Sequence, residues 1–111
     1  MDLINKKCVP CEGGTTPLEG QELDKYVAMV KLWLLAKDRK QISKEYIFAN
    51  FVTALEFVNK VGALSESEGH HPDILVFGYN KVKITLSTHA ILGLSENDFI
   101  MAVKIDELVK L

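Results

Sequence analysis

The sequence predicts an α+β domain in which helices pack on one face of a four-stranded antiparallel sheet, in the order α-β-β-α-β-β-α. Two pairs of β-prone segments are each separated by a short polar stretch, as in hairpins. Three other segments space their apolar residues as amphipathic helices do. The chain has 111 residues, 48% of them hydrophobic, which favours a single domain. We assign this domain to residues 18–111, after an extended lead-in at 1–17.

The first half of the domain is predicted to hold a helix and a hairpin. The helix runs from Leu18 to about Val30, with acidic residues near its start and apolar residues recurring along one side. The hairpin joins residues 33–36 to residues 42–48 across the polar stretch 37–40.

The second helix is predicted to begin after Asn50, a residue type that caps helix N-termini. It is predicted to end within the polar stretch 65–69. The residues at helical spacing, which we expect to be buried, are Phe51, Ala54, Leu55, Val58 and Val61.

A second hairpin and a last helix complete the prediction. Residues 74–77 pair with residues 81–88, and alternate residues of the second strand face the core, namely Val82, Ile84 and Leu86. Ser95 and Asp98 resemble a capping box that opens the last helix. The residues expected on the buried side of that helix are Phe99, Ala102, Val103, Ile105 and Val109.

Charge and hydropathy exclude some classes of protein. Thirteen basic and fifteen acidic residues give a net charge of −2, which argues against a nucleic-acid-binding protein. No apolar run approaches the ~20 residues that span a bilayer. Residues 1–7 lack the apolar stretch of a signal peptide, so a cytoplasmic protein with no membrane partner is expected.

Cys8 and Cys11 form a C-x-x-C motif, which can be half of a zinc site or a redox pair. There is no second C-x-x-C, and all three histidines lie beyond position 69. A redox pair should open a helix after a strand, whereas two glycines and Pro17 follow here. An inert structural knuckle is therefore favoured over metal binding and over redox chemistry.

The three histidines, His70, His71 and His89, fall within twenty residues of one another. The first two lie between a predicted helix and a strand, and His89 closes the second hairpin on the side away from the core. If the hairpin register brings the two ends together, three imidazoles converge at one end of the sheet. Chemistry alone leaves three alternatives: a His₃ zinc site, acid–base catalysis without metal, or surface histidines at loop ends.

Three further side chains are candidates for the same site. Glu66 precedes His70 by one helical turn and is predicted to orient its imidazole. Asp98 lies in the first turn of the last helix, where helix capping alone explains it. Trp33, the single tryptophan, fits core packing, although an indole can also stack on a planar substrate ring.

Several motifs together resemble the pterin-4a-carbinolamine dehydratase family. The pattern is E-x-x-x-H-H-P, an aromatic residue, a later T-H and then an aspartate. It is met here by segments 66–73, 79–82, 85–89 and 93–99. The lead-in Lys6–Gly14 is also similar to that of bacterial and plant-type members.

The resemblance implies a hydro-lyase that removes water from a 4a-hydroxytetrahydropterin to give the quinonoid dihydropterin. Such an enzyme recycles the tetrahydropterin cosubstrate of aromatic amino acid hydroxylases. No metal or organic cofactor is implied, and the expected assembly is a homodimer or homotetramer. Because some animal members act as dimerisation cofactors of a transcription factor, a non-catalytic interaction module is the alternative.

The resemblance also implies site residues. His70, His71 and His89 would be catalytic, and Glu66 and Asp98 would be their supporting acids. The residues predicted to bind substrate are Gly69, His70, His71, Pro72, Ser87, Thr88, His89 and Trp33.

Two features depart from the family pattern. Many members have an aromatic residue shortly after H-H-P, whereas segment 73–75 is Asp-Ile-Leu here. Many members also have two successive glycines after the last histidine, and Leu92 stands at the first of these positions. The loop after His89 is therefore expected to differ in shape.

Overall fold

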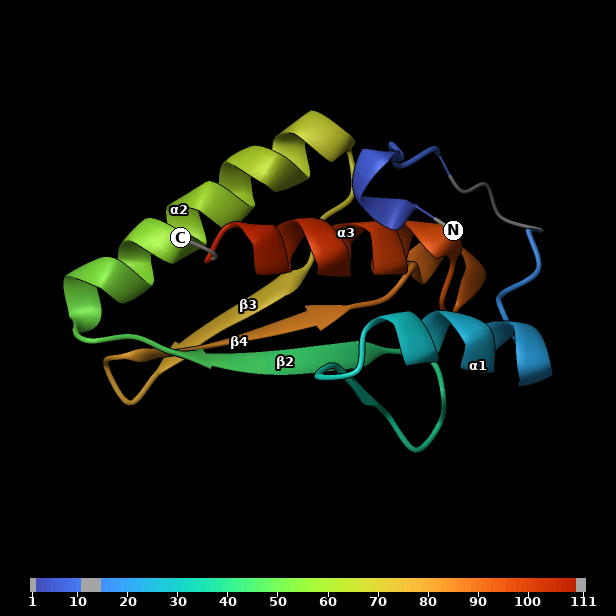
Figure 1. Cartoon of the computed structure of the whole chain (residues 1–111), viewed down its shortest axis with the longest axis horizontal. Helices are drawn as coiled ribbons and strands as arrows, with labels where there is room; N and C mark the ends of the chain where they lie inside the picture. The colour runs from blue at the N-terminus through green and yellow to red at the C-terminus, as the bar shows by residue number, and fades with distance from the viewer. Residues whose placement is uncertain (1, 11–14, 110–111) are drawn as a thin grey trace.

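Two hairpins build one antiparallel sheet, and the helices pack against a single face of it (Figure 1). The computed structural model describes residues 2–10 and 15–109. The elements in chain order are η1 (Leu3–Asn5), α1 (Gly20–Met29), β1 (Leu34–Leu35), β2 (Ile42–Ile47), α2 (Phe51–Glu68), β3 (Asp73–Phe77), β4 (Lys81–Leu86), η2 (His89–Ile91) and α3 (Glu96–Glu107). This order confirms the predicted fold, with two short 3₁₀ helices added.

The sheet has the strand order β1-β2-β4-β3, and all neighbouring strands are antiparallel. The predicted inward-facing residues of β4 are fully buried, namely Val82, Ile84 and Leu86. Asp73 pairs with Thr85, so the chain just before β3 lies beside the chain just after β4. The register therefore brings His70 and His71 to the same end of the sheet as His89.

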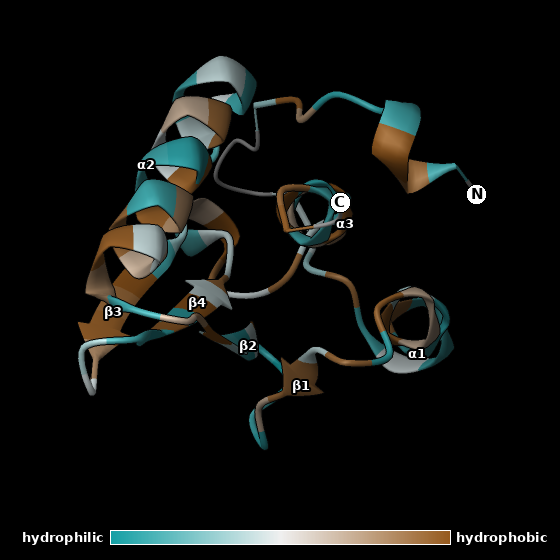
Figure 2. Cartoon of the chain, turned by 60° about the vertical axis from the view of Figure 1, so that its left-hand side comes forward, coloured by the Kyte–Doolittle hydropathy of each residue, from teal (hydrophilic) through white to brown (hydrophobic). Residues whose placement is uncertain are grey.

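Helix α3 lies between α1 and α2 over the sheet (Figures 1 and 2). Because it is covered on several sides, it buries residues around most of its circumference, namely Asn97, Asp98, Phe99, Ile100, Met101, Ala102 and Ile105. Val103 is partly buried, but Val109, predicted to be buried, lies beyond the end of α3 and is 39% exposed. Two polar residues of the first turn are thus held inside the protein.

Helix α2 begins as predicted, because Thr53 N–H donates to Asn50 Oδ1 (2.9 Å). The predicted buried stripe is wrong at Phe51 and Leu55, which are 49% and 38% exposed. The line of residues that faces the interior is Ala54, Phe57, Val61 and Ser65. Phe51 and Leu55 have the right spacing but lie on the solvent side of this line.

The N-terminal segment is more structured than the expected extended lead-in. Residues 3–5 form η1, and Leu3 is 4% exposed within the main core. Farther along, Leu18 N–H donates to the carbonyl of Leu94 (2.8 Å). Leu3 and Ile4 are too few apolar residues to form a periodic pattern, so the sequence did not predict the burial of Leu3.

Leu92 adopts a left-handed backbone conformation, with φ 55° and ψ 41°, and its side chain is 77% exposed. A Cβ atom is disfavoured there, while glycine is not. We expect Leu92→Gly to raise the free energy of unfolding by about 0.5–1 kcal/mol, measured by urea denaturation. Leu32→Gly is the matched control, because Leu32 is similarly exposed (74%) without positive φ, and it should lower stability. Equal losses in both variants would contradict this prediction.

Candidate active site

His70 is directed toward the start of α3 by the way α2 ends. Gly69 caps α2 in the left-handed conformation (φ 69°), and His70 N–H donates to the carbonyl of Ser65. The imidazole, 12% exposed, then places Nε2 at 2.6 Å from Asp98 Oδ1. The first of the three predicted histidines is therefore held by a carboxylate from a different helix.

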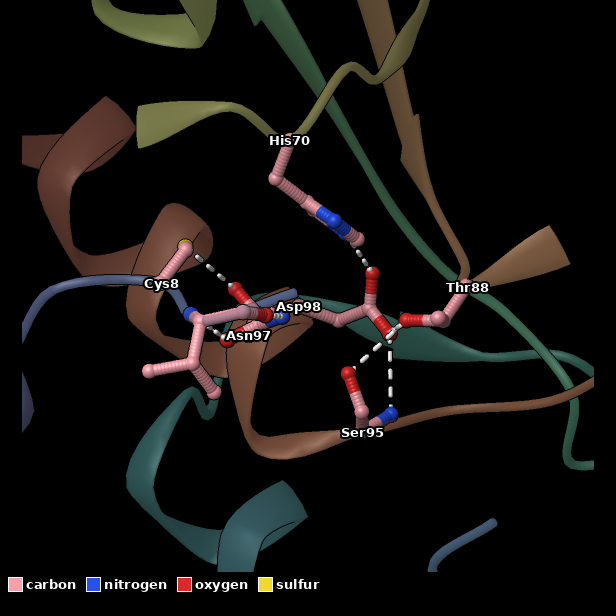
Figure 3. A network of polar contacts seen from close by, with 7 residues as sticks. Cys8, His70, Thr88, Ser95, Asn97 and Asp98 are labelled. Atoms are coloured by element: carbon pink, nitrogen blue, oxygen red, sulfur yellow. Dashed lines mark hydrogen bonds and ion pairs between the residues drawn. The ribbon is translucent and has the colours of Figure 1, made fainter. Parts of the chain in front are cut away.

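Asp98 is fully buried and is the centre of a polar network (Figure 3). Its Oδ2 accepts from Thr88 Oγ1 (2.8 Å) and from Ser95 N–H (3.0 Å), the latter being half of the predicted capping box. Since Thr88 donates to Asp98, the hydroxyl of Ser95 donates to Thr88 Oγ1 (2.8 Å). A carboxylate that only accepts fixes the tautomer of its imidazole partner, so Nε2 of His70 carries a proton.

Glu66 contacts a different histidine from the one predicted. Its Oε2 lies 2.7 Å from Nε2 of His71, and both side chains are exposed, at 80% and 62% respectively. The prediction that Glu66 orients His70 is therefore wrong for this structure. The turn at Gly69 rotates His70 toward α3 and leaves His71 on the solvent side, where its exposed contact with Glu66 contributes little to stability.

His89 opens η2, because β4 ends at Leu86, two residues earlier than predicted. Its side chain has no hydrogen bond or ion pair to any residue in the ranges 2–10 and 15–109. It lines an open cavity of about 370 Å³ together with Val9, Pro10, Gly69, His70, His71, Ser87, Thr88, Ala90 and Asn97. All three histidines and three other predicted substrate-binding residues, Gly69, Ser87 and Thr88, thus share one cavity.

Two predicted substrate-binding residues, Pro72 and Trp33, are not among the residues that line this cavity. Trp33 is 3% exposed and donates from Nε1 to Asp106 Oδ2 (3.1 Å), so it is a core residue. A larger hollow of about 510 Å³ lies elsewhere, along Ser43 and Lys83 on the outer face of the sheet, and contains no histidine. The smaller cavity is therefore the candidate site.

Four lining residues were missed by sequence reasoning: Val9, Pro10, Ala90 and Asn97. The first two lie in the segment interpreted as a lead-in, and nothing in their spacing connects them to the histidines. Asn97 had one available signal, its position directly before Asp98.

Among the described residues, no group of three or more histidine, cysteine, aspartate or glutamate side chains is arranged to hold a metal ion. The three histidines share a cavity without converging on one point, so the zinc alternative has no geometric support there. Within the same ranges, no helix is long and apolar enough to cross a membrane.

Cys8 is partly buried, and its Sγ lies 3.6 Å from the carbonyl of Asn97. Burial, together with the charge of Glu68 and its hydrogen bond, raises the pKa of the Cys8 thiol to about 12. The other half of the motif, Cys11, lies outside the described residues.

Cys8 should therefore be unreactive, because the thiolate is the nucleophile. In a Cys11→Ser variant at pH 8, we expect iodoacetamide to alkylate folded protein roughly a thousandfold more slowly than the same protein in urea, as the pKa difference dictates. Mass spectrometry of the alkylated fraction over time measures both rates. Similar rates in the folded and unfolded proteins would contradict the prediction.

Comparisons with known proteins agree on one family. A family model described as "Pterin 4 alpha carbinolamine dehydratase" matches residues 16–108. A protein of Halorhodospira halophila is 45% identical over 108 residues, which cover 97% of this chain and 98% of that protein. One of Rubrobacter xylanophilus is 45% identical over 107 residues, with 96% and 98% covered. Both are named "Putative pterin-4-alpha-carbinolamine dehydratase".

Two solved structures share the fold. A transcriptional coactivator/pterin dehydratase from Brucella melitensis superposes with a TM-score of 0.79 at 28% identity, covering 86% of this chain and 100% of that one. A pterin dehydratase-like protein, described as a RuBisCO assembly factor in the alpha-carboxysome, gives a TM-score of 0.58 at 28% identity, with 68% and 87% covered.

Proposed function

Because the chain belongs to the pterin 4 alpha carbinolamine dehydratase family, we propose that it removes water from a 4a-hydroxytetrahydropterin to give the quinonoid dihydropterin. The proposed role is to recycle the tetrahydropterin cosubstrate of an aromatic amino acid hydroxylase. The observation that carries the proposal is the cavity shared by three histidines, one of them bonded to a buried carboxylate.

The reaction needs two proton transfers. The C4a–O bond breaks, and a proton from a general acid makes the leaving hydroxyl a water molecule. A general base takes the proton of ring nitrogen N5, whose electron pair forms the C4a=N5 double bond. The C–O electron pair leaves with the water, and the N5 electron pair replaces it at C4a, so the proposed reaction needs no external oxidant or reductant. Imidazole exchanges protons near neutral pH and can serve in either role.

His70 and His89 are the proposed proton carriers. Because Asp98 accepts from Nε2–H of His70, Nδ1 is the nitrogen of that ring that exchanges a proton with the substrate. His89 comes from η2 and lines the same cavity, with both ring nitrogens unpaired among the described residues. His71, at the exposed side with Glu66, is proposed to contact the substrate.

A coupled assay tests the proposal. Phenylalanine hydroxylase generates the carbinolamine, and its ultraviolet absorbance decays as water is lost. We expect the protein to accelerate this decay, and His89→Ala to reduce the acceleration. A decay rate that is the same with and without wild-type protein would overturn the proposed function.

A second candidate function is assembly of another protein, favoured by the likeness to the pterin dehydratase-like assembly factor. A binding partner retained by wild-type protein and by a His70→Ala, His89→Ala variant, with no dehydration by either, would support it. The cavity that the three histidines share favours the dehydratase.

A further inference from the structure

Residues 6–10, called the strap below, lie across the end of α2 and the start of α3 (Figures 1 and 3). Cys8 N–H donates to Glu68 Oε1 (2.9 Å), on the last residue of α2. Val9 N–H donates to Asn97 Oδ1 (3.0 Å), and Asn97 Nδ2 donates back to the Val9 carbonyl. Two helices thus bind successive peptide groups of the strap.

The side chains of Glu68 and Asn97, called the anchors below, hold the strap and are themselves buried. Asn97 is 4% exposed, and the side chain of Glu68 is 5% exposed. Glu68 Oε2 also accepts from Lys104 Nζ (2.7 Å). Burial raises the pKa of the Glu68 carboxyl, but the hydrogen bonds from Lys104 and Cys8 N–H and the charges of Lys104 and Lys7 lower it by more. Glu68 therefore stays charged at neutral pH, and charge strengthens its bond to the strap.

The anchors also lie close in the sequence to His70 and Asp98, which are hydrogen-bonded to each other. Glu68 precedes His70 by two residues, and Asn97 directly precedes Asp98. The strap is therefore attached to the same two points of the fold that bring His70 and Asp98 together. Its position relative to the histidines is fixed by the geometry of that pair.

Beyond the anchors, the strap reaches the cavity. Val9 and Pro10 line it together with the three histidines, and Val9 presents an apolar side chain that is 64% exposed. A planar heterocycle in this cavity would cover part of that side chain, which favours binding.

We propose that the strap is a substrate-binding element, in which Val9 and Pro10 form an apolar wall of the pterin cavity and Glu68 and Asn97 are the positioning residues that hold it. The inference rests on the proposed function. It assigns the strap to substrate binding and not to proton transfer, because none of the hydrogen bonds of His70, Asp98 or His89 passes through it.

Steady-state kinetics of dehydration test this assignment. We expect Val9→Ala to raise KM roughly 3–10-fold with kcat unchanged within about twofold, because an apolar contact to substrate is lost. Val52→Ala is the matched control: Val52 is 63% exposed on α2, outside the cavity, and its replacement should change neither constant.

Substitution of the anchor Glu68 provides a second, independent test of the proposal. Glu68→Ala should raise KM as Val9→Ala does, because the strap loses a bond. Glu68→Gln should restore only part of the loss, since its amide oxygen still accepts from Cys8 N–H but its amide nitrogen faces Lys104 and the charge is lost. Melting temperatures identify any variant that fails to fold, and Val9→Ala, an exposed truncation, is expected to fold normally.

The outcomes separate the two proposals. If the wild-type enzyme is active and both Val9→Ala and Glu68→Ala have the wild-type KM, the strap assignment is overturned and the proposed dehydratase function is retained. A fall in kcat at constant KM would also overturn it, because the strap would then act on proton transfer. A wild-type protein that neither dehydrates the carbinolamine nor quenches the fluorescence of added biopterin would overturn both.

Discussion

Replacement of His70 by alanine is expected to lower kcat for dehydration by roughly 10²–10⁴-fold, the usual contribution of a general acid or base. The imidazole is bonded to a fully buried carboxylate and lines the cavity, so the nitrogen that we propose to exchange a proton with the substrate is held in place. Loss of its N–H also leaves Asp98 Oδ1 without this donor, which should cost about 1–3 kcal/mol of stability. Absorbance kinetics and urea denaturation measure the two effects.

His71→Ala is the matched control for this prediction. Its ring is the neighbouring one in the sequence, but it is exposed and paired with an exposed glutamate. We therefore expect less than about a tenfold loss of kcat and less than about 0.5 kcal/mol of destabilisation. Equal effects of the two substitutions on kcat would contradict the distinction between the buried and the exposed histidine.

Asp98→Asn is expected to lower kcat by roughly 10²–10⁴-fold while keeping the shape of the side chain. An amide nitrogen must replace one carboxylate oxygen, and both oxygens of Asp98 accept hydrogen bonds. If the amide nitrogen faces His70, Nε2 must become the acceptor and Nδ1 takes the proton, which exchanges the tautomer. If it faces Ser95 and Thr88, two donors lose their acceptor, and about 1–3 kcal/mol of stability is lost.

Asp106→Asn is the control for Asp98→Asn. Asp106 also accepts several hydrogen bonds, from Trp33, Lys44 and Tyr46, but it lies away from the cavity. Its substitution should reduce stability and leave kcat unchanged. A nitrogen-15 spectrum of the imidazoles should show a changed tautomer of His70 in Asp98→Asn alone. If Asp98→Asn retains full kcat, Asp98 does not position the catalytic ring.

The fold could be predicted from the sequence because its determinants are local. The alternation along β4 and the capping residues Asn50 and Ser95 each constrain one element, and short turns fix how the strands pair. The buried stripe of α2 was only partly predicted. Phe51 and Leu55 satisfy helical spacing, and the face that is covered depends on where the sheet lies.

The position of all three histidines at one end of the sheet could be predicted, because one hairpin register brings both segments together. Their partners could not. Glu66 and His70 have the spacing of a helical pair, but the left-handed Gly69 ends the helix before the second residue. The position of Asp98 opposite His70 depends on how α3 packs beside α2, which local patterns do not encode.

The strap was beyond sequence reasoning for the same reason. Cys8 and Val9 bond to residues some sixty and ninety positions away in the chain, and a segment of five residues is too short for a periodicity that would indicate such contacts. Its ordering depends on two buried side chains, Glu68 and Asn97. Each of these residues would be interpreted from the sequence alone as an ordinary polar residue of a helix end.

The rate of carbinolamine dehydration by a His70→Ala, His89→Ala double variant tests the central claim most directly. Wild-type protein should accelerate loss of the carbinolamine absorbance at neutral pH. The double variant, shown to be folded by circular dichroism, should leave the decay at its uncatalysed rate. Full dehydratase activity in the folded double variant would contradict the claim that these imidazoles carry the protons.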